Sequence, residues 1–182
     1  MDIAFVTLPG IGGSGEQHWQ THWERADTRF KRFKPTSWDA PDVSDWTAAV
    51  DRELGLAPQS VVLVAHSLAC LLVAHWAQKT LARVAGAFLV SVPDPAATKF
   101  PAAAASFAAV PATALVFPAL IVASTDDPYG TLDYARQRAG QWKAGIVEVG
   151  PLGHINGASG LGDWPQGRML LEAFSSGLGM GR

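Results

Sequence analysis

Cysteine is nearly absent from this chain, which has a single one, Cys70, among 182 residues. A lone thiol excludes an internal disulfide framework and suits a reducing compartment. The first residues contain neither a basic region nor a small-residue cleavage pattern, so no Sec-type export is expected. We therefore expect a cytoplasmic protein.

Long apolar runs and an excess of charge of one sign are absent as well. No stretch approaches the ~20 apolar residues that a membrane-spanning helix needs, so we expect no membrane association. With 14 basic and 16 acidic side chains, the net charge is -2. The sequence therefore has no excess of positive charge with which to bind nucleic acid. The expected partner is a small molecule, and the oligomeric state stays open.

Metal-binding patterns are also missing. His18 and His22 are four residues apart, but they stand beside tryptophans rather than carboxylates, and no ligand cluster joins them. We predict no metal and no cofactor.

Short apolar runs alternate with segments of helical character along the chain. Each run ends in Gly, Pro, Ser or Asp, which is typical of buried parallel strands joined by crossover helices. We predict one α/β domain over residues 1–182, with a mostly parallel sheet of about six strands flanked by helices. The candidate strands are residues 3–8, 30–34, 60–65, 84–91, 119–124 and 146–149.

Helices are predicted from polar starts and apolar stripes. Ser14 and Gln17 have the spacing of a capping box, and Ser44 is expected to cap a second helix. The segment 67–79 is apolar almost all round, which predicts a buried helix, and residues 168–178 close the chain.

The segment 93–118 differs from the rest, because it has five prolines and only two charged residues. A long connection of this kind in a compact domain is often functional. We expect a lid, with a disordered loop as the alternative.

The strongest chemical pattern surrounds Ser67, where an apolar strand runs directly into a serine and then a helix. This predicts a nucleophile elbow, in which tiny residues two positions either side of the serine let strand and helix approach closely. Ala65 and Ala69 occupy the two places that are glycine in G-x-S-x-G. The alternative is that Ser67 is an ordinary helix N-cap.

An acid and a histidine follow in the order Ser, acid, His. Asp127 lies just after an apolar strand and before a proline, with Asp126 as the competing candidate. His154 follows the last predicted strand in a glycine-containing loop. We predict that Ser67 is the nucleophile, His154 the general base and Asp127 the orienting acid. The other histidines are expected to be structural, and His66 is expected to point away from Ser67 because side chains alternate along a strand.

Two backbone N–H groups are expected to stabilise the oxyanion. One belongs to Leu68, after the nucleophile, and the other to the glycine-rich loop after the first strand, with Ile11 preferred and Gly12 in reserve. Phosphate binding is the alternative interpretation of that loop. We expect the pocket to be small and aromatic, walled by Trp38, Tyr129 and Trp164, although ordinary packing also suits each aromatic ring.

These residues resemble the small serine hydrolases related to retinoblastoma-binding protein 9, a minimal branch of the α/β-hydrolases. The resemblance covers nearly the whole chain. It rests on residues 9–13, Trp19 and Trp23, 38–46, 65–69, 126–129, 153–156 and 159–165. It implies an α/β-hydrolase fold and a triad on Ser67, Asp127 and His154. Where the family usually has a histidine before the first loop glycine, this sequence has Pro9. The L-x-C-x-E motif, through which the family's namesake would bind retinoblastoma protein, does not occur in this sequence.

We therefore expect a serine hydrolase, an esterase acting on small acyl esters through an acyl-enzyme. The alternative is a noncatalytic binding or scaffolding protein that retains the hydrolase fold.

Overall fold

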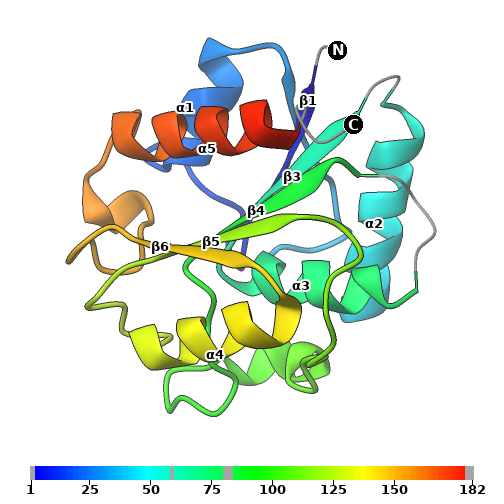
Figure 1. The fold of residues 1–182 in the computed structure, drawn as a ribbon. Coiled ribbons are helices and arrows are strands. Elements are labelled where there is room, and N and C mark those ends of the chain that lie inside the picture. The colour runs from blue at the N-terminus through cyan, green and yellow to red at the C-terminus, as the bar shows by residue number, and fades with distance from the viewer. Residues whose placement is uncertain (1–2, 58–59, 80–83, 179–182) are drawn as a thin grey trace.

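A six-stranded sheet forms the centre of the molecule in this computed structural model, which describes residues 3–57, 60–79 and 84–178. The strand order is β2-β1-β3-β4-β5-β6, and helices cover both faces (Figure 1). The strands are β1 (Ala4–Leu8), β2 (Phe30–Arg32), β3 (Val61–His66), β4 (Gly86–Val90), β5 (Ala119–Ala123) and β6 (Gly145–Glu148). Every neighbouring pair is parallel, so the predicted α/β architecture with a parallel sheet of about six strands flanked by helices is confirmed.

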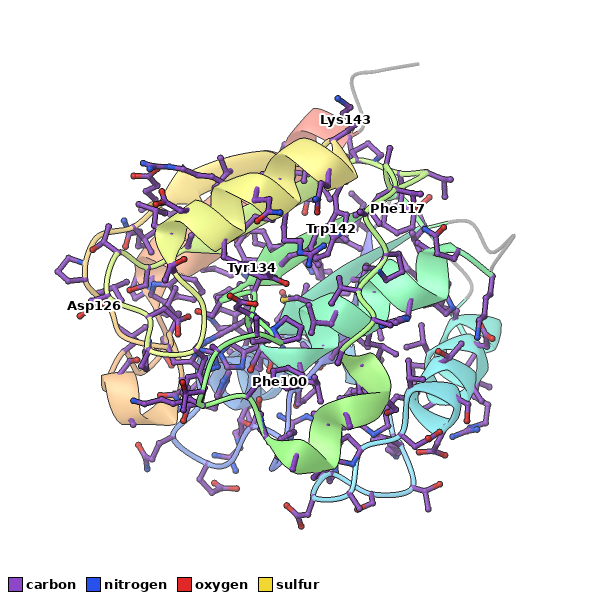
Figure 2. The ribbon with its side chains drawn as sticks, turned by 90° about the horizontal axis from the view of Figure 1, so that it is seen from below. Phe100, Phe117, Asp126, Tyr134, Trp142 and Lys143 are labelled. Carbon is purple, nitrogen blue, oxygen red and sulfur yellow. The ribbon has the colours of Figure 1, made fainter. Side chains whose placement is uncertain are left out.

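The helices form one layer on each face of the sheet. On one face lie α1 (Trp19–Ala26) and α5 (Pro165–Leu178), and on the other lie α2 (Val43–Gly55), α3 (Leu68–Ala77) and α4 (Leu132–Trp142). Figure 2 shows Tyr134 and Trp142 between α4 and α3, where both belong to the larger apolar cluster. Burial on both faces explains why the central strands β1, β3, β4 and β5 are almost continuously apolar. No helix among the described residues is both long and apolar enough to cross a membrane.

The residues that cap two helices differ from those predicted. His18, not Ser14, is the N-cap of α1, because its Nδ1 accepts a hydrogen bond from the N–H of Gln20. Asp42, not Ser44, caps α2. Several polar residues precede each helix, and local spacing alone does not decide which of them meets the free N–H groups.

The connection over residues 93–118 packs against α3. It contains a short 3₁₀ helix, η1 (Ala102–Phe107), in which Ala104 and Phe107 are fully buried in the larger apolar cluster. Pro93, Phe100 and Pro101 line a cavity at the end of β3. The segment is therefore an ordered part of the cavity wall, and its opening as a lid stays a prediction.

Candidate active site

Ser67 stands at the turn between β3 and α3, in a backbone conformation that is rare for a residue with a side chain. Its φ is 56° and its ψ is -125°, a combination that surrounding contacts must hold in place. The N–H of Ser67 donates to the carbonyl of Val90 at 2.9 Å, and its carbonyl accepts the N–H of Cys70 at 2.8 Å. Its side chain makes no capping hydrogen bond with the described residues. The local geometry is thus that of an elbow, not of an ordinary N-cap.

Three side chains meet at this turn in one chain of hydrogen bonds. Nε2 of His154 lies 2.8 Å from Oγ of Ser67, and Nδ1 lies 2.8 and 2.9 Å from the two carboxylate oxygens of Asp127. Because a carboxylate only accepts, Nδ1 carries the proton and the Nε2 lone pair faces the serine hydroxyl. The side chains of His154 and Asp127 are only 9% and 3% exposed. Such an arrangement can activate a hydroxyl as a nucleophile.

The two neighbouring aspartates have different contacts. Asp127 reaches His154, whereas Oδ1 of Asp126 accepts hydrogen bonds from the hydroxyl of Ser124 and the N–H of Gly153, each at 2.8 Å. These two bonds, the Ser124 hydroxyl first, lower the pKa of Asp126. Asp126 therefore joins the loop after β5 to the loop that carries His154.

Two backbone N–H groups beside Ser67 have no hydrogen-bond partner among the described residues, those of Ile11 and Leu68. The N–H of Gly12, the reserve candidate, donates instead to the carbonyl of Trp38 at 3.2 Å. Ile11 and Leu68 are thus the pair available to a negatively charged oxygen.

The loop that carries Ile11 is held close to the elbow. A Cβ added at Gly10 would lie 3.0 Å from Cβ of Ser67, so only glycine permits this approach without a shift. The guanidinium of Arg32 donates to the carbonyls of Gly13 and Ser14, at 3.0 and 3.1 Å. Arg32 therefore holds the loop through two of its carbonyls, and the neighbouring Pro9 has no side-chain donor of its own.

The phosphate-binding alternative for this loop does not fit the structure. Residues 10–15 have the G-x-G-x-x-G spacing, but α1 begins only at Trp19. The last glycine of a dinucleotide loop lies at the start of its helix, whose N-terminus faces the phosphates. Among the described residues, no group of three or more His, Cys, Asp and Glu side chains is placed to hold a metal.

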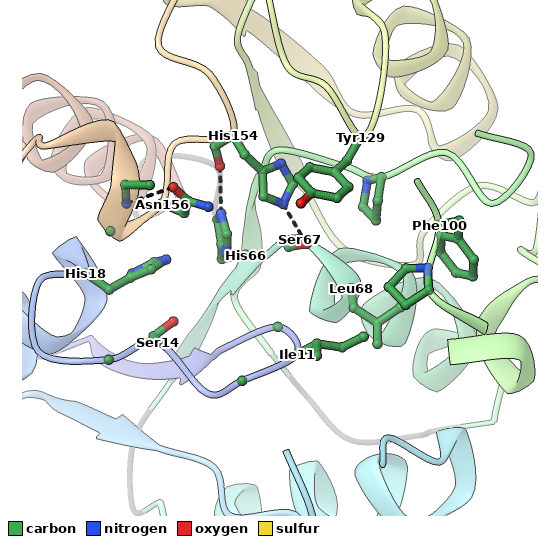
Figure 3. A pocket seen from close by; sticks show the side chains of 17 residues that line it. Ile11, Ser14, His18, His66, Ser67, Leu68, Phe100, Tyr129, His154 and Asn156 are labelled. Atoms are coloured by element: carbon green, nitrogen blue, oxygen red, sulfur yellow. Dashed lines mark hydrogen bonds between the residues drawn. The ribbon is translucent and has the colours of Figure 1, made fainter. Parts of the chain in front are cut away.

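A cavity of about 360 Å³ opens over Ser67 (Figure 3). Of the three aromatic residues predicted for its wall, Tyr129 lines it, with its ring 4.5 Å from that of His154. The other two are absent from the described residues that line the cavity, which are Gly10, Ile11, Gly12, Ser14, Gly15, His18, His66, Ser67, Leu68, Pro93, Phe100, Pro101, Tyr129, His154, Asn156, Gly157 and Ala158.

Trp38 and Trp164 have packing roles instead. Trp38 lies against Gly13, where an added Cβ would come within 2.8 Å of its ring. Trp164 is 2% exposed and packs against Trp19 and Trp23 on the opposite face of the sheet. Their prediction as pocket walls is wrong, because a large aromatic ring is as useful for filling a core as for lining a pocket.

Two histidines that the sequence did not connect with this site also line the cavity. His66 does not point away: its Nε2 lies 2.9 Å from the carbonyl of His154, and the two rings are 5.0 Å apart. The ring of His18 is in turn 4.7 Å from that of His66. His66 keeps the alternation of β3, on the face of Val62 and Val64 with Trp19, and the loop with His154 reaches over that face.

Comparisons with known proteins show the family of this chain. A family model described as serine hydrolase matches residues 5–173. The chain belongs to the serine hydrolase family. A search of curated proteins finds no match for this serine hydrolase.

Solved structures of hydrolases share the fold of this serine hydrolase over almost its full length. A YdeN-like hydrolase from Pectobacterium atrosepticum is 33% identical, with 97% of this chain and 92% of the other covered and a TM-score of 0.88. The ydeN gene product of B. subtilis is 20% identical, with 97% and 100% covered and a TM-score of 0.80. A thermophilic esterase from Thermogutta terrifontis is 14% identical, with 97% and 90% covered and a TM-score of 0.68. The last two show the likeness of fold alone.

Proposed function

We propose that this serine hydrolase cleaves small esters through an acyl-enzyme on Ser67. The serine oxygen attacks the ester carbonyl while Nε2 of His154 takes the hydroxyl proton, and Asp127 stabilises the imidazolium. The N–H groups of Ile11 and Leu68 hold the resulting oxyanion. Its collapse expels the alcohol, which takes the proton from His154.

Water completes the reaction. It attacks the acyl carbonyl and gives a proton to His154, and the acid leaves as the serine oxygen recovers that proton. At the end of the cycle Ser67 again carries its hydroxyl proton and His154 is neutral, so the free enzyme is regenerated.

The observation that carries this proposal is the 2.8 Å contact between His154 Nε2 and Ser67 Oγ, backed by Asp127. The cavity of about 360 Å³ supports a small substrate. An esterase among the solved structures with this fold supports the ester class.

A fluorophosphonate probe tests the nucleophile. The wild type should be labelled and should hydrolyse p-nitrophenyl esters, and Ser67→Ala should lose both properties. Ser176→Ala is a matched control, because this hydroxyl donates to the carbonyl of Glu172 on α5 and should leave labelling intact. A folded wild type with neither labelling nor turnover would instead favour the noncatalytic binding or scaffolding protein.

We also propose that the chain lies in the branch related to retinoblastoma-binding protein 9 and works in the cytoplasm. The motif residues support the first point, and the lone buried thiol of Cys70 supports the second. Phylogenetic placement among serine hydrolases and cell fractionation test the two separately.

A further inference from the structure

The cavity over Ser67 has two ends of unlike chemistry. Phe100, Leu68 and Ile11 lie on one side of the serine in Figure 3, while His18 and Asn156 lie on the other. The first end offers apolar surface. The second end is lined by polar side chains that the proposed reaction does not use.

His18 presents a hydrogen-bond donor that has no acceptor. The residue is 5% exposed, and burial lowers its pKa to about 3, so the ring is neutral at physiological pH. Nδ1 accepts the N–H of Gln20 at 3.2 Å, so the single proton is on Nε2. That N–H has no partner among the described residues. A buried donor without an acceptor is destabilising, and native structures rarely keep one without a functional reason.

Asn156 adds a second donor at the same end. Its Oδ1 accepts the N–H of Ala158 at 3.0 Å, which identifies the other end of the amide as the NH₂ group. Figure 3 shows this amide beside His66, on the side facing His18. No described residue accepts a hydrogen bond from Nδ2. Asn156 is half-buried, so Nδ2 is the outer donor and Nε2 of His18 the inner one.

We propose that Asn156 Nδ2 and His18 Nε2 bind an oxygen acceptor of the substrate, a carbonyl or carboxylate that a short linker joins to the scissile ester. This inference rests on the proposed ester hydrolysis at Ser67. The short apolar group on the other side of the ester then occupies the end formed by Phe100 and Leu68. The substrate is thus a small bifunctional ester, whose second oxygen lies in either the alcohol or the acyl half.

Two pairs of esters of matched shape distinguish a second oxygen in the alcohol half of the substrate from one in the acyl half. In the alcohol pair, acetonyl butyrate carries a ketone where isobutyl butyrate carries a branched methyl group. In the acyl pair, p-nitrophenyl 4-oxopentanoate is matched with p-nitrophenyl 4-methylpentanoate. The measured quantity is the ratio of kcat/KM within each pair, in wild type and variants, so intrinsic reactivity cancels between proteins.

Two variants remove the donors and keep the local caps. His18→Asn retains an acceptor for Gln20 but lacks Nε2, and Asn156→Asp retains Oδ1 for Ala158 but replaces NH₂ with an oxygen. We expect each variant to lower the ketone-to-alkyl ratio about tenfold or more in one of the two pairs, the same pair for both. His22→Asn, one turn further along α1 and paired with Asp163, is the matched control and should leave both ratios unchanged.

Fluorophosphonate labelling of Ser67 in every protein separates the two proposals. Labelled variants whose ratios equal those of the wild type in both pairs overturn the acceptor site and leave the hydrolase proposal intact. A wild type that is neither labelled nor active overturns ester hydrolysis, and the acceptor site with it.

Discussion

Oδ1 of Asp126 accepts the backbone N–H of Gly153 at 2.8 Å. Gly153 directly precedes His154, so this bond sets the position of the loop, while the adjacent Asp127 contacts the imidazole itself. Two successive carboxylates thus act on the same histidine, one through the backbone and one through the ring.

Replacement by asparagine is expected to have different effects at these two aspartates. Asp127→Asn should lower kcat on p-nitrophenyl butyrate by on the order of 10³- to 10⁴-fold, because an amide no longer favours the tautomer with its proton on Nδ1. Asp126→Asn keeps an oxygen that accepts from Gly153 and should cost less than about tenfold. Steady-state kinetics of both variants decide the matter, and equal losses would contradict the assignment.

The close approach of Gly10 to Ser67 predicts that a side chain at position 10 lowers activity by a steric effect alone. Gly10→Ala places a Cβ 3.0 Å from that of Ser67, so the loop with Ile11 must move away and weaken the oxyanion contact. We expect kcat/KM to fall about tenfold or more. Gly140→Ala in α4, where an added Cβ meets nothing within 4 Å, should leave kcat/KM unchanged. Full activity in Gly10→Ala would show that the loop does not supply the donor.

Substituting Arg32 is expected to affect both the stability of the protein and its activity, through two different sets of contacts. Besides Gly13 and Ser14, its guanidinium contacts Glu24 at 2.9 Å, and these two side chains are 24% and 18% exposed. Arg32→Met should lower the free energy of unfolding by about 1–3 kcal/mol, because Glu24 is left as a partly buried unpaired charge. It should also lower kcat, because the loop carbonyls lose their donors.

The double variant Arg32→Met/Glu24→Gln tests that explanation. Removing the unpaired charge should restore much of the stability in urea unfolding, whereas kcat should stay low. Recovery of both quantities together would mean that Arg32 acts on the fold alone.

The lowered pKa of His18 predicts that the protein loses stability in acid. This pKa is about 3 in the folded protein, mainly because burial disfavours the charged ring, against an ordinary value of 6.5. Between these pH values the unfolded chain binds a proton that the folded chain does not, so the free energy of unfolding falls as pH falls. This one group contributes a slope of up to about 1.4 kcal/mol per pH unit. His18→Asn should make the slope shallower in urea unfolding at pH 7, 6, 5 and 4. An unchanged slope would contradict the assigned burial.

The sheet and the candidate nucleophile could be predicted because their signals are local. Apolar runs ending in turn residues indicated the other parallel strands, whereas β2 had only Phe30 and Phe33 to indicate it, and the run into Ser67 indicated the elbow. The carboxyl ends of parallel strands share one edge of the sheet, so the positions of Ser67, Asp127 and His154 after three predicted strands already predicted that they lie together. That His18 and Asp42, rather than Ser14 and Ser44, cap α1 and α2 was not predictable in this way, because several polar residues compete at each helix start.

The amino-acid sequence by itself therefore determined the sheet and the neighbourhood of three side chains. Only the tertiary structure decided that Asp127 faces His154 and Asp126 faces Gly153, that Gly12 is engaged by Trp38, and that His18 and His66 line the cavity. The reason is that periodicity positions a residue along its own element, whereas its contacts depend on loops that are held by partners distant in the chain.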